Sequence, residues 1–200
     1  SMTYVEKNPA TFGSELVNAI ASGRAPSLVL LPQELLLAER DKLLLIPEAT
    51  LSSRTIKDTF VQEGELFFAS GGGIYGIPFS VDPLVMYWNR DLLFGSGASN
   101  PPKTWDDMVA LAPKLSVHSG NGTITRSAAA LGGWNNNENA KAILSALFFQ
   151  VGTPIVGLSS QGTPAALLDV SSGDVLATAD SALRFYTDFG NPAKTTYSWN

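Results

Sequence analysis

The feature that most constrains how this chain folds is a proline-punctuated turn between two apolar runs, within residues 73–93 (GIYGIPFSVDPLVMYWNRDLL). The turn lies at Ser80–Pro83, and the apolar run Leu84–Trp88 follows at once. Glycines allow close approach, a carboxylate accepts hydrogen bonds from hydroxyl groups, and aromatic rings can stack. All three occur in this stretch, which indicates a ligand-binding turn. Its polar and aromatic side chains include Tyr75, Ser80, Asp82, Tyr87 and Asn89.

The bulk composition excludes several classes of function. The 200 residues are 44% hydrophobic and 16% charged, which suits one large domain or two small lobes. A net charge of −5 without a run of Lys or Arg argues against nucleic acid and against an anionic membrane surface as partners. The chain has no cysteine, which excludes disulfides and cysteine-ligated metals. The only histidine, His118, lacks partners for a metal site or a catalytic triad, and we expect no cofactor.

Apolar spacing predicts a helix and then a strand at the start of the chain. Asn8-Pro9 is a typical helix start, with Asn as the N-cap. Apolar residues then recur every fourth position up to Ile20, and Gly23 is expected to close the helix. The short run Ser27–Leu31, which Pro32 stops, is typical of a parallel strand buried on both faces.

Helical and extended patterns alternate along the rest of the chain, which favours the α/β class. Thr104 and Asp107 have the spacing of a capping box at a helix start. Extended segments are expected over Ile74–Phe79, Leu84–Trp88 and Ile124–Leu131. Helices are expected over Gln33–Lys42, Thr55–Phe60, Asn136–Val151 and Thr178–Phe189.

Two blocks of the sequence resemble a known family: Tyr75–Leu93 (YGIPFSVDPLVMYWNRDLL) and Pro101–Met108 (PPKTWDDM). They resemble the extracellular solute-binding proteins of ABC importers, in the sugar-binding group related to maltose-binding protein. In that family the first block is where the chain first crosses from one lobe to the other. Weaker similarity extends to residues 19–31, 182–189 and 196–200.

The resemblance implies an α/β, two-lobe periplasmic-binding-protein-like type II fold, with residues 1–82 in the first lobe, 83–200 in the second and a hinge near 81–85. It implies a binding protein, not an enzyme, that captures a carbohydrate between the lobes by closing around it. The partner would be the transmembrane subunits of an ABC permease. The location would be extracytoplasmic, in the periplasm or on the outer face of the cytoplasmic membrane, with a lipid anchor on the full-length protein.

Compared with the family pattern, the chain is expected to be a fragment that is incomplete at both ends. Such a fragment would expose unpaired strand edges and bare apolar sheet surface. We therefore expect it to pair with other copies as a homo-oligomer.

The candidate ligand-binding residues combine hydrogen-bonding groups and aromatic faces, as sugar sites do. The resemblance places Asp82 beside the hinge, and the alternative is an Asp that only shapes the turn before Pro83. A Trp near position 199 often forms a ring platform in the family. Trp134 and Asn135 follow an expected strand, at the end where open α/β sheets bind ligands; the alternative is a loop with a packing Trp. The full set is Ser80, Asp82, Tyr87, Trp134, Asn135 and Trp199.

Other classes of function remain open. One is a degenerate fragment that serves as an interaction module and binds no small molecule. Another is a glycan-acting enzyme, which needs two carboxylates roughly 5–9.5 Å apart, whereas only Asp82 is a candidate. A receptor for a non-sugar solute, such as a polyamine or a phosphate ester, is a third.

Overall fold

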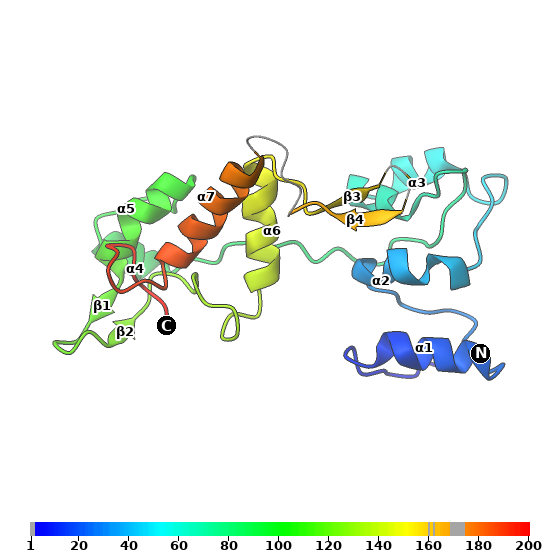
Figure 1. The fold of residues 1–200 in the computed structure, drawn as a ribbon, viewed down its shortest axis with the longest axis horizontal. Coiled ribbons are helices and arrows are strands. Elements are labelled where there is room, and N and C mark those ends of the chain that lie inside the picture. The colour runs from blue at the N-terminus through cyan, green and yellow to red at the C-terminus, as the bar shows by residue number, and fades with distance from the viewer. Residues whose placement is uncertain (1–2, 160, 162, 169–174) are drawn as a thin grey trace. The chain divides into compact units, whose positions relative to one another are not determined.

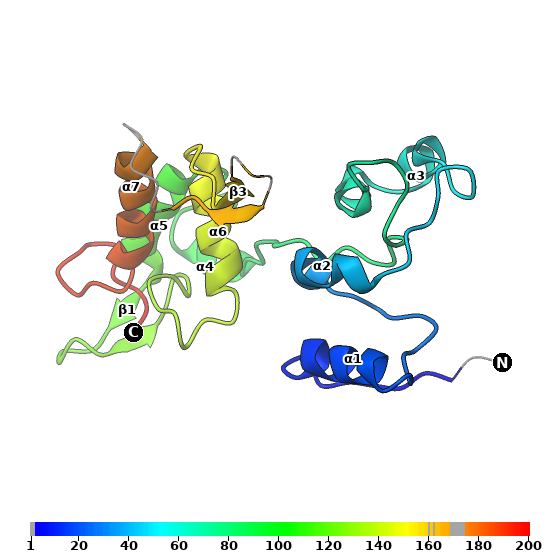
Figure 2. The same ribbon diagram turned by 45° about the vertical axis from the view of Figure 1, so that its right-hand side comes forward.

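The computed structural model describes residues 3–159, 161, 163–168 and 175–200. The chain divides into two compact units, residues 1–83 and 84–200, and Figures 1 and 2 show their elements from two directions. Assigning these units to two lobes joined by a hinge near residues 81–85 stays a prediction. No helix of the described part is long and apolar enough to span a bilayer.

The first unit is built from short helices. The helix predicted at Gln33–Lys42 is confirmed as α2 continued by a 3₁₀ turn, and the one predicted at Thr55–Phe60 is confirmed with an earlier start. Ser52 caps the latter, because its hydroxyl accepts a hydrogen bond from Thr55 N at 3.1 Å. The buried apolar side chains include Leu16, Leu36, Ile56 and Ile74. The elements are α1 (Phe12–Ala21), α2 (Gln33–Glu39), η1 (Arg40–Lys42), α3 (Ser53–Thr59) and η2 (Gln62–Phe67).

Helix α1 ends as predicted but begins later. Asn8 is not its N-cap, because the Asn8 carboxamide accepts a hydrogen bond from Ala10 N at 2.9 Å within a preceding turn. The N-cap is Thr11. At the other end Gly23 has a φ of 68°, and the backbone N–H groups of Gly23 and Arg24 donate back into the last turn. This is the Schellman pattern that favours Gly.

The strand predicted at Ser27–Leu31 is wrong. Within the described residues this segment pairs with no other strand, and Leu28 and Leu30 are 77% and 58% exposed. An apolar run becomes a strand only where a neighbour supplies hydrogen bonds, and here none lies alongside. The parallel sheet expected of the α/β class is therefore not found in the described part of the chain.

The second unit contains four helices and two antiparallel strand pairs among its described residues. The predicted extended run Leu84–Trp88 forms no strand there, and the strand predicted at Ile124–Leu131 shrinks to three residues. The helix predicted at Asn136–Val151 is confirmed with a later start. The elements are α4 (Arg90–Gly95), α5 (Trp105–Leu115), β1 (Val117–His118), β2 (Ile124–Arg126), α6 (Ala140–Gln150), β3 (Val156–Leu158), β4 (Pro164–Ala166) and α7 (Val175–Asp188).

The core of the second unit lies between α6 and α7, which run side by side in Figures 1 and 2. Trp105 ties α5 to both helices. Its indole Nε1 donates to Gln150 Oε1 at 2.6 Å, and its ring meets Phe185 edge-on at 5.3 Å between centroids. The buried residues of this core cluster are Ala112, Leu131, Ala140, Leu147, Ala182, Tyr186 and Phe189.

The capping box predicted at the start of α5 is confirmed. Thr104 Oγ1 accepts a hydrogen bond from Asp107 N at 3.2 Å, and Asp107 Oδ2 accepts from Thr104 N at 3.0 Å. A further bond from Lys103 N reaches the same carboxylate oxygen at 3.0 Å. These donors stabilise the charged form and lower the pKa of Asp107, with the Lys103 N–H the largest contributor.

Candidate functional site

A polar network in the second unit fixes the loop between β2 and α6, residues 127–139. Tyr186 on α7 is 2% exposed, and its hydroxyl donates to Gly133 O at 2.6 Å. The Asn137 amide nitrogen donates to Ala130 O at 2.5 Å and to Tyr186 Oη at 3.2 Å. The loop backbone is thereby held at two carbonyl groups before it enters α6.

The segment after α7 crosses this loop at close range. Gly132 has a φ of 98°, and a Cβ there would lie 2.8 Å from Gly190 Cα, so the two backbones touch. Ser198 is fully buried. Its backbone N donates to Phe189 O at 2.8 Å and its hydroxyl donates to Ala129 O at 3.1 Å. These contacts bring the residues that follow Ser198 against the loop.

Asn136 connects the loop to the last two residues of the chain. Trp199 Nε1 donates to Asn136 Oδ1 at 3.1 Å, and Asn136 Nδ2 donates to Asn200 O at 2.8 Å. Gly133 leaves the space that this arrangement needs, because a Cβ at Gly133 would overlap Asn136 Oδ1 and lie 3.3 Å from Trp199 Cδ1. The Trp199 indole is therefore held beside the loop that carries Trp134.

An open pocket of about 350 Å³ lies where this loop enters α6. The Trp134 side chain is 60% exposed at its wall. Neither Glu138 nor Lys141 forms an ion pair with any described residue. The pocket thus combines an aromatic face, amides and two charges of opposite sign. Its lining residues are Trp134, Asn135, Asn137, Glu138, Ala140 and Lys141.

The structure gathers three of the six predicted site residues in one region. Trp134 and Asn135 line the pocket, and Trp199 lies beside Gly133. Ligand binding by these residues stays a prediction.

The other three do not line this pocket. Ser80 and Asp82 belong to the first unit, are exposed, and make no side-chain hydrogen bond to any described residue. Tyr87 is 92% exposed on a segment without a strand partner in the described chain. Their role as ligand contacts also stays a prediction.

Sequence reasoning missed the residues that hold the site together. Asn136 and Asn137 stand in the same run of asparagines as Asn135, but nothing in the run shows which of them faces Trp199. Tyr186 has the spacing of a core residue, and its carbonyl partner lies 53 positions earlier. The charged pair Glu138 and Lys141 has i,i+3 spacing, which is equally typical of a solvated helix surface.

No group of three or more His, Asp or Glu side chains with the geometry of a metal site occurs among the described residues. His118 lies in β1 and is exposed. Its ring stacks on Tyr197, with centroids 5.4 Å apart and planes at 17°.

Comparisons with known proteins give a family match over the whole chain and matches to individual proteins over parts of it. A family model described as "Bacterial extracellular solute-binding protein" matches residues 1–200. The osmoprotective compounds-binding protein GgtB of Synechocystis is 28% identical over 107 residues, which are 52% of this chain and 25% of that protein. A Brucella abortus protein whose name describes it as a binding protein is 39% identical over 49 residues, 24% of this chain and 12% of its own.

An uncharacterized ABC transporter extracellular-binding protein of Pyrococcus horikoshii is 43% identical over 44 residues, 22% of this chain and 10% of that protein. The matched segments span a quarter or less of the length of these relatives.

Proposed function

Because the chain belongs to the bacterial extracellular solute-binding proteins, we propose that it is the substrate-binding component of an ABC transporter. In this proposal it captures a carbohydrate and delivers it to the permease subunits in the membrane. It acts by binding, without catalysis. The family description implies an extracytoplasmic location, and a lipid anchor on the full-length protein is part of the proposal.

The observation that carries the carbohydrate assignment is the exposed Trp134 ring beside the amide of Asn135 in an open pocket. An indole face covers the apolar C–H surface of a sugar ring, and amide and carboxylate groups pair with its hydroxyls. The nearby Trp199 indole supplies a second aromatic surface in the same unit.

A second candidate is a receptor for a small non-sugar solute. It is favoured by Glu138 and Lys141, which form no ion pair with any described residue. A carboxylate next to an exposed indole suits a quaternary ammonium or a polyamine, because aromatic faces attract cations. The name of the relative GgtB mentions osmoprotective compounds.

Isothermal titration calorimetry with maltose, trehalose, sucrose, glycine betaine and spermidine distinguishes the two candidates. Saturable heat with one of the three sugars, and none with glycine betaine or spermidine, is the result expected of a carbohydrate receptor. Binding of glycine betaine or spermidine alone favours the second candidate. An absence of saturable heat with all five solutes contradicts both.

A further inference from the structure

We propose that Asn136 is a positioning residue that sets the Trp199 indole as a ring platform beside the Trp134 loop. The inference rests on the proposed function and assigns a role within the same region. Asn136 itself does not line the pocket that Trp134 and Asn135 form, so its role is exerted through Trp199.

The two hydrogen bonds of the Asn136 carboxamide specify one orientation. An indole has a single donor and no acceptor, whereas a backbone carbonyl only accepts. The amide oxygen must therefore face Trp199 Nε1 (3.1 Å) and the amide nitrogen must face Asn200 O (2.8 Å). A flipped amide would set the amide nitrogen against the indole N–H and the amide oxygen against Asn200 O. The two hydrogen bonds therefore fit only one orientation of the Asn136 carboxamide.

Hydrogen bonds also fix the loop on both sides of Asn136. Its neighbour Asn137 is tied to Tyr186 and to Ala130 O, and Gly133 on the other side is tied to the Tyr186 hydroxyl. Asn136 is thus flanked by fixed points, which limits where its amide can reach. The Trp199 backbone is also held, because its N–H donates to Phe189 O at 3.1 Å.

The backbone hydrogen bond of Trp199 does not fix the side-chain torsions of this residue. A hydrogen bond from the indole N–H restricts them. The bond to Asn136 removes that freedom before a solute arrives, which lowers the entropic cost of ordering the ring on binding. Loss of the bond is expected to weaken binding about tenfold, the equivalent of one modest hydrogen bond.

Four variants separate positioning from mere stability. Asn136→Ala removes the acceptor, and Asn136→Asp keeps an acceptor for the indole. Gly133→Ala places a methyl group where Asn136 Oδ1 lies, so it disturbs the bond while both partner residues keep their own side chains. The matched control is Asn139→Ala, which removes an amide from the same loop whose side chain makes no cap hydrogen bond.

Two measurements are made on each variant. The first is the ¹H–¹⁵N spectrum of the indole N–H groups, in which the four tryptophans give separate signals and Trp199→Phe assigns one of them. The second is calorimetric titration with maltose, trehalose, sucrose, glycine betaine and spermidine in turn. The first readout needs no solute, so it decides the geometry independently of the proposed function.

The expected result is an upfield shift and faster exchange of the Trp199 indole proton in Asn136→Ala and Gly133→Ala. Asn139→Ala should keep the wild-type signal. Asn136→Asp should keep the indole proton hydrogen-bonded, because a carboxylate oxygen still accepts it, although the bond to Asn200 O is lost. The affinity for whichever of the five solutes binds the wild type should fall about tenfold in the first two variants only.

An unchanged indole signal in Asn136→Ala overturns the inference. A changed signal with wild-type affinity overturns it as well, since the ring's position would then not serve binding. If none of the five solutes binds the wild type, the proposed function fails, and the indole signals still decide whether Asn136 holds Trp199.

Discussion

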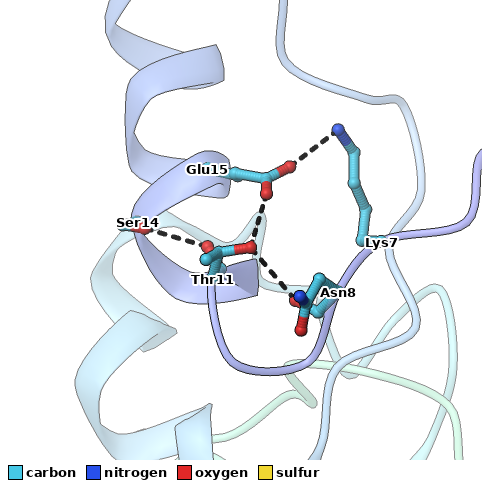
Figure 3. Close-up of polar contacts among 5 residues, drawn as sticks. All are labelled: Lys7, Asn8, Thr11, Ser14 and Glu15. Atoms are coloured by element: carbon cyan, nitrogen blue, oxygen red, sulfur yellow. Dashed lines mark hydrogen bonds and ion pairs between the residues drawn. The ribbon is translucent and has the colours of Figure 1, made fainter.

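At the scale of single residues, the start of α1 shows how local donors tune a carboxylate (Figure 3). Thr11 Oγ1 donates to Glu15 Oε1 at 2.6 Å, and Lys7 Nζ donates to Glu15 Oε2 at 2.9 Å. The Thr11 hydrogen bond is the largest cause of a lowered pKa at Glu15, followed by Lys7. Because the pKa is lower in the folded state, the stabilisation is present above the unfolded-state pKa. It is lost as pH falls through the folded-state value.

We predict that Thr11→Val raises the pKa of Glu15 toward its ordinary value, since the strongest donor to the carboxylate is removed. NMR titration of the Glu15 carboxyl carbon measures this directly. Ser14→Ala is the control, because the Ser14 hydroxyl donates to Thr11 O and not to Glu15. An identical titration curve for Thr11→Val and wild type would show that the hydroxyl does not tune the carboxylate.

We also predict that Trp134→Ala weakens sugar binding by about 1–3 kcal/mol, because a ring face of the solute loses its cover. Asp82→Asn should weaken binding too, if that carboxylate accepts hydroxyl hydrogen bonds. Calorimetry with the tightest-binding sugar of the panel measures both, with Asp106→Asn as the control for loss of an exposed acid. If both variants bind the sugar with wild-type affinity, neither Trp134 nor Asp82 belongs to the binding site.

At the scale of elements, the buried Tyr186 hydroxyl links α7 to the β2–α6 loop. We predict that Tyr186→Phe destabilises the fold by about 1–3 kcal/mol, because Gly133 O loses its donor and the Asn137 amide loses an acceptor. Urea unfolding monitored by circular dichroism gives the value. Tyr197→Phe serves as the control, because its hydroxyl has no hydrogen bond to any described residue. Equal stability of the two variants would argue against the network.

The capping box at the start of α5 gives a second prediction at this scale. Thr104→Ala should cost about 1 kcal/mol of stability, since Asp107 N loses its acceptor, and it should leave solute preference unchanged. Thr104→Ser retains the hydroxyl and should restore most of the stability. A shifted solute preference without a change in melting temperature would contradict a purely capping role.

At the scale of the whole molecule, large apolar side chains of the first unit lie at its surface. Leu28, Leu30, Leu44 and Phe79 are each more than half exposed. Where such side chains lie together on a surface, they favour association with another protein surface.

We therefore predict that the protein self-associates into a dimer or a larger oligomer. Light scattering coupled to gel filtration gives the mass across a dilution series. The double variant Leu28→Lys with Leu30→Lys should shift the population toward monomer, because burying two ammonium groups is costly. A monomeric mass at every wild-type concentration would refute the prediction.

The sequence alone determined the features that depend on neighbours along the chain. The capping box closes between Thr104 and Asp107, and the end of α1 is set by Gly23, because the hydrogen bonds involved span a few residues. The resemblance carried by residues 75–93 and 101–108 is likewise local, and the family match over the whole chain confirms it.

The tertiary structure decided what depends on distant partners. The run Ser27–Leu31 has a strand's composition but pairs with no strand in the described part of the chain, and composition cannot reveal that absence. Tyr186 and Gly133 are 53 positions apart, and Trp199 and Asn136 are 63 apart. Such contacts form only once the helices pack and carry their loops together. For that reason Trp134 was predictable as a candidate, whereas the Asn136 hydrogen bond that holds Trp199 beside the Trp134 loop was not.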